Sequence, residues 1–363
     1  MYFVQFERPP RVLTEEAPFM RTWITGAITI ATQPNGTIYD QDITLKASLL
    51  SSNDDDTPCL TESYEWRAGM TRLPIVFDVS NGVIWPVRVL VCADGQESGS
   101  LSPLATPSLN RTPRVCLAWS PAFDNLNPIA SDERVERRFK LSSKRTLRAW
   151  ESCGQNSAQI KSSGVVLLSH LDDVIGLRTD GVKQMEQKFA LAASKKLSII
   201  DMSQNCGAIG ITVAQLIPDS NVVILDDAEA LPTIEDNIRM MSPAFASTVR
   251  FGDWNSSSMG DRGSPGRPVD MIFSTAAQFN DDKSLRTVEI LGKMIERSPK
   301  AVVVLVEEEI VGNAKTSHGV GRSSPLATML RERGHKLRGS ETFPGDPALP
   351  QYHVMVFHGS NRR

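Results

Sequence analysis

The sequence has no long apolar run and no bias toward charge of one sign, and we expect no secretory signal. No stretch reaches the roughly 18 consecutive apolar residues that span a bilayer, and the opening MYFVQFERPP lacks a basic region followed by an apolar one. The formal net charge of -3 gives no whole-chain argument for a nucleic acid or an anionic membrane as partner. We therefore expect a cytoplasmic or nuclear protein that binds no membrane, with a protein rather than a nucleic acid as its partner.

Cysteine and histidine are also scarce, with five of each. No two cysteines lie at C-x-x-C spacing, and a structural zinc site needs clustered ligands, so we expect no metal site. Free buried thiols in a reducing compartment are the simpler prediction. The cysteines are Cys59, Cys92, Cys116, Cys153 and Cys206.

The length of 363 residues predicts two domains. Residues 1–125 are expected to form a β-rich, sandwich-like domain, because short segments rich in β-branched and aromatic residues alternate with polar turns. An immunoglobulin-like topology is one of several that fit. Pro86 in the fourth segment predicts an edge strand or a bulge there. The segments are residues 22–30, 43–50, 73–79, 83–92 and 115–119.

Residues 126–162 are expected to form a basic helical linker. Two runs, 132–140 and 144–150, carry most of its charge. They could be a contact surface for an acidic partner or nucleic acid, or a solvated connecting helix with Val135, Phe139 and Leu147 along one side. The second interpretation is favoured, because the charge of the whole chain does not support the first.

Residues 163–363 show the alternation of strands and helices that is typical of a Rossmann-like α/β domain. Successive strand–helix–strand units with apolar strands predict a parallel sheet covered on both faces. The last two strands have no helix between them and are expected to be antiparallel neighbours. The expected strands are 197–202, 221–225, 271–273, 301–306, 336–343 and 352–357, and the helices are 208–217, 229–241, 283–297 and a short one after Ser324–Pro325.

The loop after the first of these strands, residues 201–210, is where such a sheet binds ligands. A nucleoside cofactor needs glycine there, because the backbone must turn tightly and approach the ligand closely. Roughly twenty-five residues later, Asp226 and Asp227 follow the second strand. A carboxylate at that place can accept hydrogen bonds from both ribose hydroxyls; an exposed turn is the alternative.

Residues 197–238 resemble the core of the class I S-adenosylmethionine-dependent methyltransferases. Within that class they are most similar to the protein lysine methyltransferases and the nicotinamide N-methyltransferase-like proteins. Asp201, Gly207 and Gly210 match the family's first motif, while Ser203 and Asn205 stand where two glycines are expected. The resemblance implies S-adenosyl-L-methionine as cofactor and a cofactor site at Asp201, Ser203, Asn205, Gly207 and Asp226.

Further matches extend the resemblance over about half of the chain. Asp253–Trp254 resembles the family's pair beside the adenine, and residues 175–179 resemble the segment at the cofactor's methionine end, with Asp180 in place of tryptophan. The family's signature after the fourth strand aligns with residues 276–280, where Phe279 replaces tyrosine and Asn280 is retained. The resemblance places Asp253 and Trp254 at the cofactor, and Phe279 and Asn280 at the substrate. A turn or capping role fits Asp253 and Asn280 equally well.

The departures from the motif have physical consequences. A residue other than glycine at positive φ costs about 1 kcal/mol, and asparagine tolerates it best, so Ser203 and Asn205 are expected to fold normally. Their side chains are expected to project toward the cofactor's carboxypropyl arm, where they weaken binding or hydrogen-bond the ligand. Ala276 replaces an acid that in the family helps to hold the cofactor amine or the incoming lysine.

Two other features have competing interpretations. Cys206 lies at a helix N-terminus, where a thiolate is stabilised, but a buried core residue is the favoured interpretation. Residues Glu307–Glu309 could bind a metal or an ammonium group, but a solvated acidic loop is favoured.

Two hypotheses for function follow. The first is a methyltransferase acting on a protein lysine or another nitrogen, with the amino-terminal domain recruiting the protein. The second is a catalytically degenerate pseudo-methyltransferase that acts as an interaction scaffold. A dehydrogenase is excluded, because the loop lacks G-x-G-x-x-G.

Overall fold

The computed structural model forms two compact units. It describes residues 1–15, 20–33, 36–51, 54–94, 115–130, 134–141, 143, 145–152, 158–175, 183–191, 195–253, 268–275, 282–309, 325–343 and 351–359. The first unit, here the β-rich unit, comprises residues 1–106, 113–140 and 148–162; the second, the α/β unit, comprises 107–112, 141–147 and 163–363. None of the helices in the described part of the chain is long and apolar enough to cross a membrane.

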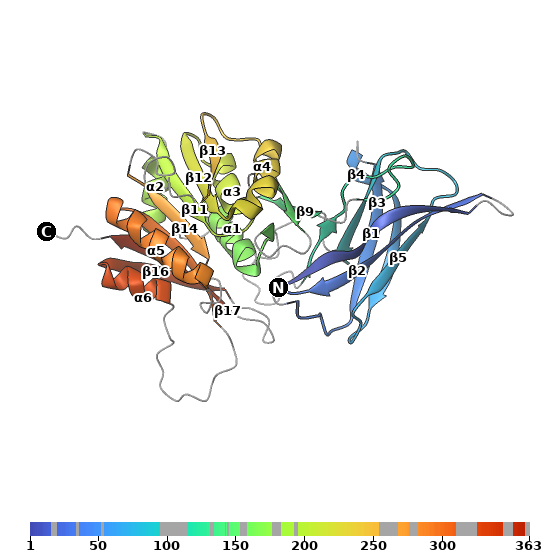
Figure 1. Cartoon of the computed structure of the whole chain (residues 1–363), viewed down its shortest axis with the longest axis horizontal. Coiled ribbons are helices and arrows are strands. Elements are labelled where there is room, and N and C mark those ends of the chain that lie inside the picture. Colours follow the sequence, from blue (N-terminus) through green and yellow to red (C-terminus); the bar gives the residue numbers. More distant parts are fainter. Residues whose placement is uncertain are drawn as a thin grey trace. The chain divides into compact units, whose positions relative to one another are not determined.

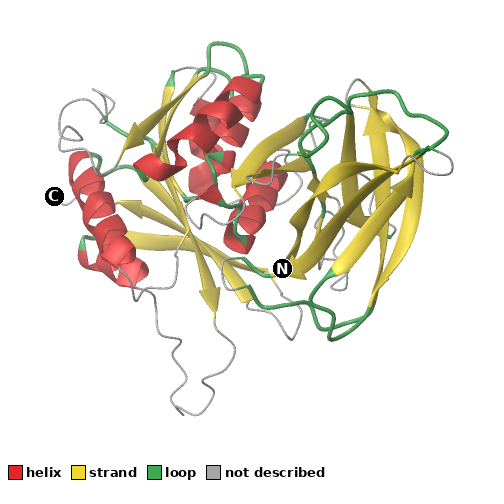
Figure 2. Ribbon diagram, turned by 45° about the vertical axis from the view of Figure 1, so that its right-hand side comes forward, coloured by secondary structure: helices red, strands yellow, loops and turns green. Residues whose placement is uncertain are grey.

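The β-rich unit contains two sheets, as Figure 2 shows. One has the order β5-β2-β1-β7 and the other β10-β9-β8-β6-β3-β4. Strict alternation sets which side chains are buried: along β5, Leu73, Ile75 and Phe77 are buried and the residues between them are exposed. The strands are β1 (Tyr2–Glu15), β2 (Arg21–Ala31), β3 (Ile43–Ser51), β4 (Asp54–Trp66), β5 (Leu73–Asp78), β6 (Val87–Ala93), β7 (Val115–Cys116), β8 (Ala118–Trp119), β9 (Arg134–Lys140) and β10 (Thr146–Ser152).

The expected basic helix between the domains is wrong, since both charged runs are strands, β9 and β10. Their charged side chains are buried as ion pairs instead of solvated. Arg137 donates from Nε to Oε1 of Glu151 at 2.8 Å and from Nη1 to the Leu117 carbonyl at 2.7 Å. Both members of the pair are 1% exposed. These two runs were predicted to be a solvated helix because they are rich in charged residues, although they form two strands of a sheet.

On the other side of β9, Glu136 is fully buried and binds three arginines. It accepts hydrogen bonds from Arg88, Arg138 and Arg148 at 2.6 to 2.8 Å. Burial acts to raise the pKa of Glu136, but the hydrogen bonds and charges of Arg148 and Arg138 outweigh it and hold the pKa below its usual value. This cluster links β6, β9 and β10 through side chains.

Pro86 does not mark an edge strand or a bulge. It precedes β6, which starts at Val87 and pairs with β3 on one side and β8 on the other. Because Pro86, which lacks an N–H, lies just outside the ladder, it does not prevent β6 from being a central strand. Two further strands, β1 and β4, add to the expected β-rich domain.

The α/β unit is a seven-stranded sheet of order β13-β12-β11-β14-β15-β17-β16, which confirms the Rossmann-like prediction (Figure 1). Pairings from β13 to β15 are parallel, and β17 runs antiparallel to both of its neighbours. Its elements are α1 (Ser162–Ile175), α2 (Lys183–Leu191), β11 (Leu197–Met202), α3 (Ala208–Leu216), β12 (Ser220–Asp226), η2 (Ala228–Ala230), α4 (Leu231–Met240), β13 (Thr248–Asp253), β14 (Met271–Thr275), α5 (Asp282–Arg297), β15 (Val302–Glu309), α6 (Pro325–Glu332), β16 (His335–Phe343) and β17 (Gln351–Gly359).

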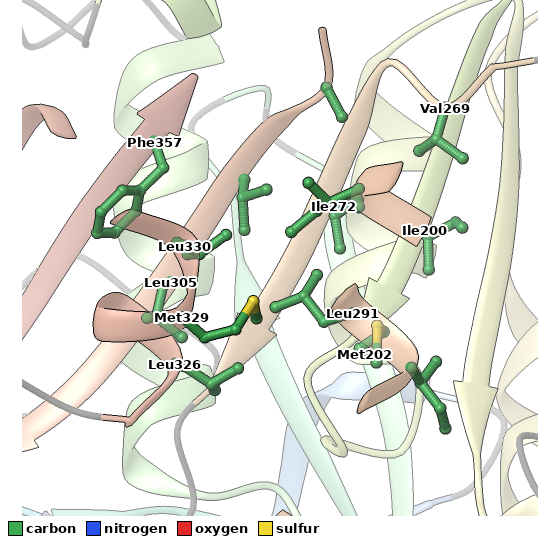
Figure 3. Packing of buried hydrophobic residues seen from close by; sticks show 14 of the residues in the cluster. Ile200, Met202, Val269, Ile272, Leu291, Leu305, Leu326, Met329, Leu330 and Phe357 are labelled. Carbon is green, nitrogen blue, oxygen red and sulfur yellow. The ribbon is translucent and has the colours of Figure 1, made fainter. Parts of the chain in front are cut away.

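Each face of this sheet packs against helices. Leu291 of α5 and Leu326 of α6 contact one face, where Ile200, Ile272 and Leu305 are buried (Figure 3). On the opposite face, a Cβ added at Gly210 of α3 would lie 2.9 Å from Val222 and 3.1 Å from Ile224. Apolar strands covered on both faces explain why these segments have no polar alternation.

Candidate cofactor site at the carboxyl edge of the sheet

The carboxyl ends of β14, β11, β12 and β13 lie side by side at one edge of the sheet. The chain passes from β11 outward to β12 and β13 and then returns to β14 on the other side of β11. This reversal is the switch point at which open α/β sheets bind ligands. The register sets Met202 beside Ser274, and Asp226 beside Asp253. Several of the predicted site residues therefore meet at this edge.

Asp201 holds the two ends of the loop that follows β11. Its Oδ1 accepts the Ser203 N–H at 2.9 Å, and its Oδ2 accepts the Gly210 N–H at 2.8 Å. The carboxylate is 1% exposed, and burial raises its pKa although these hydrogen bonds oppose the shift. The contacts show how Asp201 fixes the loop, while its contact with a cofactor stays a prediction.

The loop at residues 203–207 takes its positive φ angles at positions that we did not expect. They fall on Gln204 (φ 54°), Cys206 (φ 55°) and Gly207 (φ 74°), and not on Ser203 or Asn205. The first two positive φ angles therefore fall on the residues that follow Ser203 and Asn205, and not on the two positions where the motif has glycine. Cys206 is fully buried, as the core interpretation predicts.

Gly207 is the position where the loop has least room. An added Cβ would lie 2.7 Å from Cδ1 of Ile224, and its positive φ already disfavours any other residue. Asn237 of α4 supports the same turn, because its Nδ2 donates to the Cys206 carbonyl at 3.0 Å. Glycine at 207 thus lets the loop lie directly against β12.

The Asn205 side chain turns back onto its own loop and onto α1. Its Nδ2 donates to the Ser203 carbonyl at 2.6 Å, and Oγ1 of Thr275 donates to the same carbonyl at 2.6 Å. A Cβ at Gly164 of α1 would lie 2.8 Å from Nδ2 of Asn205 and closer still to its Oδ1. Asn205 therefore fills the space between the loop and α1, and Gly164 leaves room for it.

Asp226 lies where a ribose-binding carboxylate is expected. It ends β12, is 1% exposed, and accepts the Asp227 N–H on Oδ1 at 2.8 Å. Asp253 ends the neighbouring strand and is partly exposed. Two adjacent strand ends thus present carboxylates on the side of β11 opposite to Thr275.

These features fit a nucleoside cofactor at two points. Glycine at 207 leaves the backbone of the turn without a side chain where it packs against β12, and Asp226, at the end of β12, has a carboxylate oriented by the Asp227 N–H. Trp254, Phe279 and Asn280, together with Ala276 and residues 176–180, lie outside the described residues. Their expected roles remain predictions.

The remaining candidates belong to other parts of the fold. Glu307–Glu309 are the end of β15, paired with β17, and not the expected acidic loop. Among the described cysteines, Cys92, Cys116 and Cys206 are buried and Cys59 is exposed, so the expectation of buried thiols fails at Cys59. No group of three or more possible metal ligands occurs among the described residues.

Sequence patterns missed Gly164 and Thr275. Both contact the loop only through the tertiary fold, since they lie about forty residues before it and about seventy after it. No spacing rule connects them to the motif, so only the packing of α1 and β14 against the loop reveals them.

Comparisons with known proteins agree with this architecture. Residues 141–316, just under half of the chain, match the family described as lysine methyltransferase. The match confirms the resemblance to the S-adenosylmethionine-dependent methyltransferases. No curated protein matches the chain.

Solved structures that match the chain include methyltransferases of several kinds. The O-methyltransferase TomG from Streptomyces achromogenes, in complex with SAM, is 16% identical, with a TM-score of 0.33 over 53% of this chain and 90% of that one. TYW2 from P. horikoshii, in complex with MeSAdo, is 13% identical, with a TM-score of 0.35 over 63% and 72%. The N-methyltransferase NodS from Bradyrhizobium japonicum is 12% identical, with a TM-score of 0.34 over 49% and 95%.

Proposed function

We propose that the α/β unit, as a methyltransferase domain related to the lysine methyltransferases, binds S-adenosylmethionine and methylates the amine of a protein lysine. The observation that carries the proposal is that the Gly207 turn packs against Ile224 of β12, the strand that Asp226 ends, at the switch point of the sheet. A carboxylate there can accept both ribose hydroxyls, and the turn lets the backbone approach the ligand.

When bound, S-adenosylmethionine would supply an electrophilic methyl group for transfer to a neutral amine, with S-adenosylhomocysteine and a proton as the other products. The chain's own contribution is to position the reactants. Asp201 holds both ends of the loop and Asn237 holds the turn at Cys206, so the surfaces that would contact the ligand are fixed in advance. Such positioning accounts for much of the rate of a group transfer.

The β-rich unit is proposed to recruit the protein that carries the lysine, in the cytoplasm or the nucleus. Its two sheets supply a folded body separate from the cofactor edge. The buried free thiols Cys92 and Cys116 suit a reducing compartment.

Calorimetric titration of the full chain with S-adenosylhomocysteine tests the cofactor site. We expect the Asp226→Ala variant to bind about a hundredfold more weakly, because two charge-assisted hydrogen bonds of about 1.5 kcal/mol each are lost. Asp227→Ala is the matched control and should change the affinity less than threefold, since it keeps the N–H that orients Asp226. Equal losses in both variants would contradict a ribose role for Asp226.

A scaffold without catalysis is the second candidate, and the position of Asn205 favours it. The side chains of Ser203 and Asn205 are fully buried where the motif has two glycines. If the wild type releases no heat with S-adenosylhomocysteine at millimolar concentration, the scaffold replaces the enzyme. If it binds, transfer of a radiolabelled methyl group to proteins of a cell extract distinguishes an enzyme from a cofactor-binding scaffold.

A further inference from the structure

We infer that the Asn205 side-chain amide competes with the cofactor's amino group for the Ser203 carbonyl, and so lowers the affinity for ligands that carry the amino-acid arm. The inference rests on the proposed function, because it concerns the same site. It makes Asn205 a residue that sets which part of the cofactor is held tightly.

The competition follows first from the capacity of one carbonyl oxygen. A carbonyl has two lone pairs, and the Ser203 oxygen already accepts Asn205 Nδ2 and Thr275 Oγ1, each at 2.6 Å. Ser203 is itself fully buried. A third donor can reach this oxygen only when one of the present donors leaves.

The order of the strands gives the direction in which the cofactor's arm would extend, which is toward the strands that flank this carbonyl. A nucleoside held by Asp226 and Asp253 lies over the ends of β12 and β13. Neighbouring strands are about 4.8 Å apart, so the rest of the molecule extends over β11 and β14, where Ser203 and Thr275 lie. The arm ends in an ammonium group, which is a donor without acceptor capacity.

Packing on α1 explains why Asn205 stays at the carbonyl. The side chain is fully buried and lies against Gly164, where even a methyl group would overlap it. A glycine at 205 would remove the amide donor and leave the space between the loop and α1 open. Substituting Asn205 by glycine therefore frees one lone pair of the Ser203 carbonyl and some space between the loop and α1 for a ligand.

Two ligands distinguish the contribution of the amino-acid arm to the affinity from that of the nucleoside. S-adenosylhomocysteine carries the amino-acid arm, and 5′-methylthioadenosine shares the nucleoside and the sulfur but lacks that arm. We expect Asn205→Gly to bind S-adenosylhomocysteine about tenfold more tightly than the wild type does, which corresponds to about one hydrogen bond. Binding of 5′-methylthioadenosine should change less than twofold.

Gln204→Gly is the matched control for backbone freedom. It places glycine in the same loop at a residue with φ 54° but keeps the Asn205 amide. Its ratio of affinities for the two ligands should equal that of the wild type. A ratio that shifts as far in Gln204→Gly as in Asn205→Gly would overturn the inference, because loop flexibility would then explain the change.

A thermal-unfolding cycle tests the packing without any ligand. Gly164→Ala should lower the melting temperature of the wild type, and Asn205→Gly should remove most of that loss in the double variant, because the overlapping side chain is gone. Additive effects would overturn the contact. Absence of binding by every variant to either ligand would reject the proposed function together with the inference, whereas an unchanged affinity ratio in Asn205→Gly would reject the inference alone.

Discussion

The β-rich unit and the α/β unit both bury carboxylates almost completely, but different partners surround these carboxylates. In the β-rich unit, Glu136 and Glu151 accept hydrogen bonds from arginine side chains of β6, β9 and β10, and Glu151 accepts the Ile160 N–H as well. In the α/β unit, Asp201 and Asp226 accept hydrogen bonds from backbone N–H groups within their own loops. Each of these four residues is at most 1% exposed.

The difference separates a structural use of buried charge from one that suits a binding site. An arginine neutralises the carboxylate and ties two strands together, so the pair has little left to offer a ligand. Backbone N–H groups orient a carboxylate without neutralising it, so a ligand's hydroxyl groups can still be bound. Buried acids at strand ends, held by backbone, are therefore the better guide to a site.

The largest effect is expected from a variant that breaks the buried ion pair between Arg137 and Glu151. Arg137→Met leaves Glu151 buried without its guanidinium partner, so we expect the β-rich unit to lose about 3–5 kcal/mol of stability in chemical denaturation. The double variant Arg137→Met with Glu151→Leu should recover most of this loss. Arg72→Ala is the control, because its pair with Glu7 is exposed and should contribute less than about 1 kcal/mol. A small loss in Arg137→Met would mean that water reaches Glu151.

An intermediate effect tests how far the α/β unit depends on backbone. Gly207→Ala combines an unfavourable φ with an overlap at Ile224, so we expect a loss of about 2–4 kcal/mol in the unfolding of the α/β unit. Gly69→Ala is the control, because Gly69 also has a positive φ (+86°) but no described atom lies within 4 Å of the added Cβ. It should cost only the backbone term, about 1–2 kcal/mol. Equal losses would show that the loop relaxes away from β12.

The smallest expected effect concerns a buried histidine of the α/β unit, whose ring is hydrogen-bonded neither to a side chain nor to the backbone among the described residues. His335 is 3% exposed, and neither ring nitrogen has a hydrogen-bond partner in the part of the chain that the structure describes. Burial lowers the pKa of His335, with the charge of His358 contributing. The unfolded chain takes up this proton near pH 6.5 and the folded chain only at lower pH, so stability falls as the pH drops below 6.5.

We expect the wild type to lose about 1 kcal/mol between pH 7.5 and pH 5.5 through this residue, which calorimetric melting at the two pH values measures. His335→Phe should show a smaller loss. His353→Gln is the matched control, because its ring is hydrogen-bonded to Thr342 at the surface, and it should behave as the wild type does. An identical pH dependence in His335→Phe and the wild type would rule out His335 as the cause.

Sequence patterns predicted the α/β unit more completely than the β-rich one. The buried parallel strands are apolar throughout, so β11, β12 and β15 stand out in the sequence. The edge strand β13 was not expected as a strand, because its half-exposed residues form no apolar run.

In the β-rich unit, composition concealed several strands. β1 contains Pro9 and Pro10, where the pairing with β2 shifts register, and β4 begins with three aspartates. β9 and β10 carry charged residues that looked solvated and proved to be paired. Propensity describes single residues, whereas the pairing that makes these strands favourable is formed between residues far apart in the chain.

For the candidate site, local spacing predicts some of the residues and tertiary packing determines others. Asp201, Gly207 and Asp226 follow a local spacing that the sequence carries. The direction of the Asn205 side chain depends on Gly164 and Thr275, which come from α1 and β14. Tertiary contacts of this kind leave no local pattern.

The position of β17 has a consequence for how the α/β unit is made. This strand is the last one described, yet it lies between β15 and β16 and pairs with both. Until residues 351–359 have left the ribosome, β15 has an edge of unpaired backbone N–H and C=O groups, and β16 lacks the one described strand that it pairs with. Completion of the described sheet therefore requires the insertion of β17 between two strands rather than its addition at an edge, and a chain cut before residue 351 would be a target for chaperones and proteases.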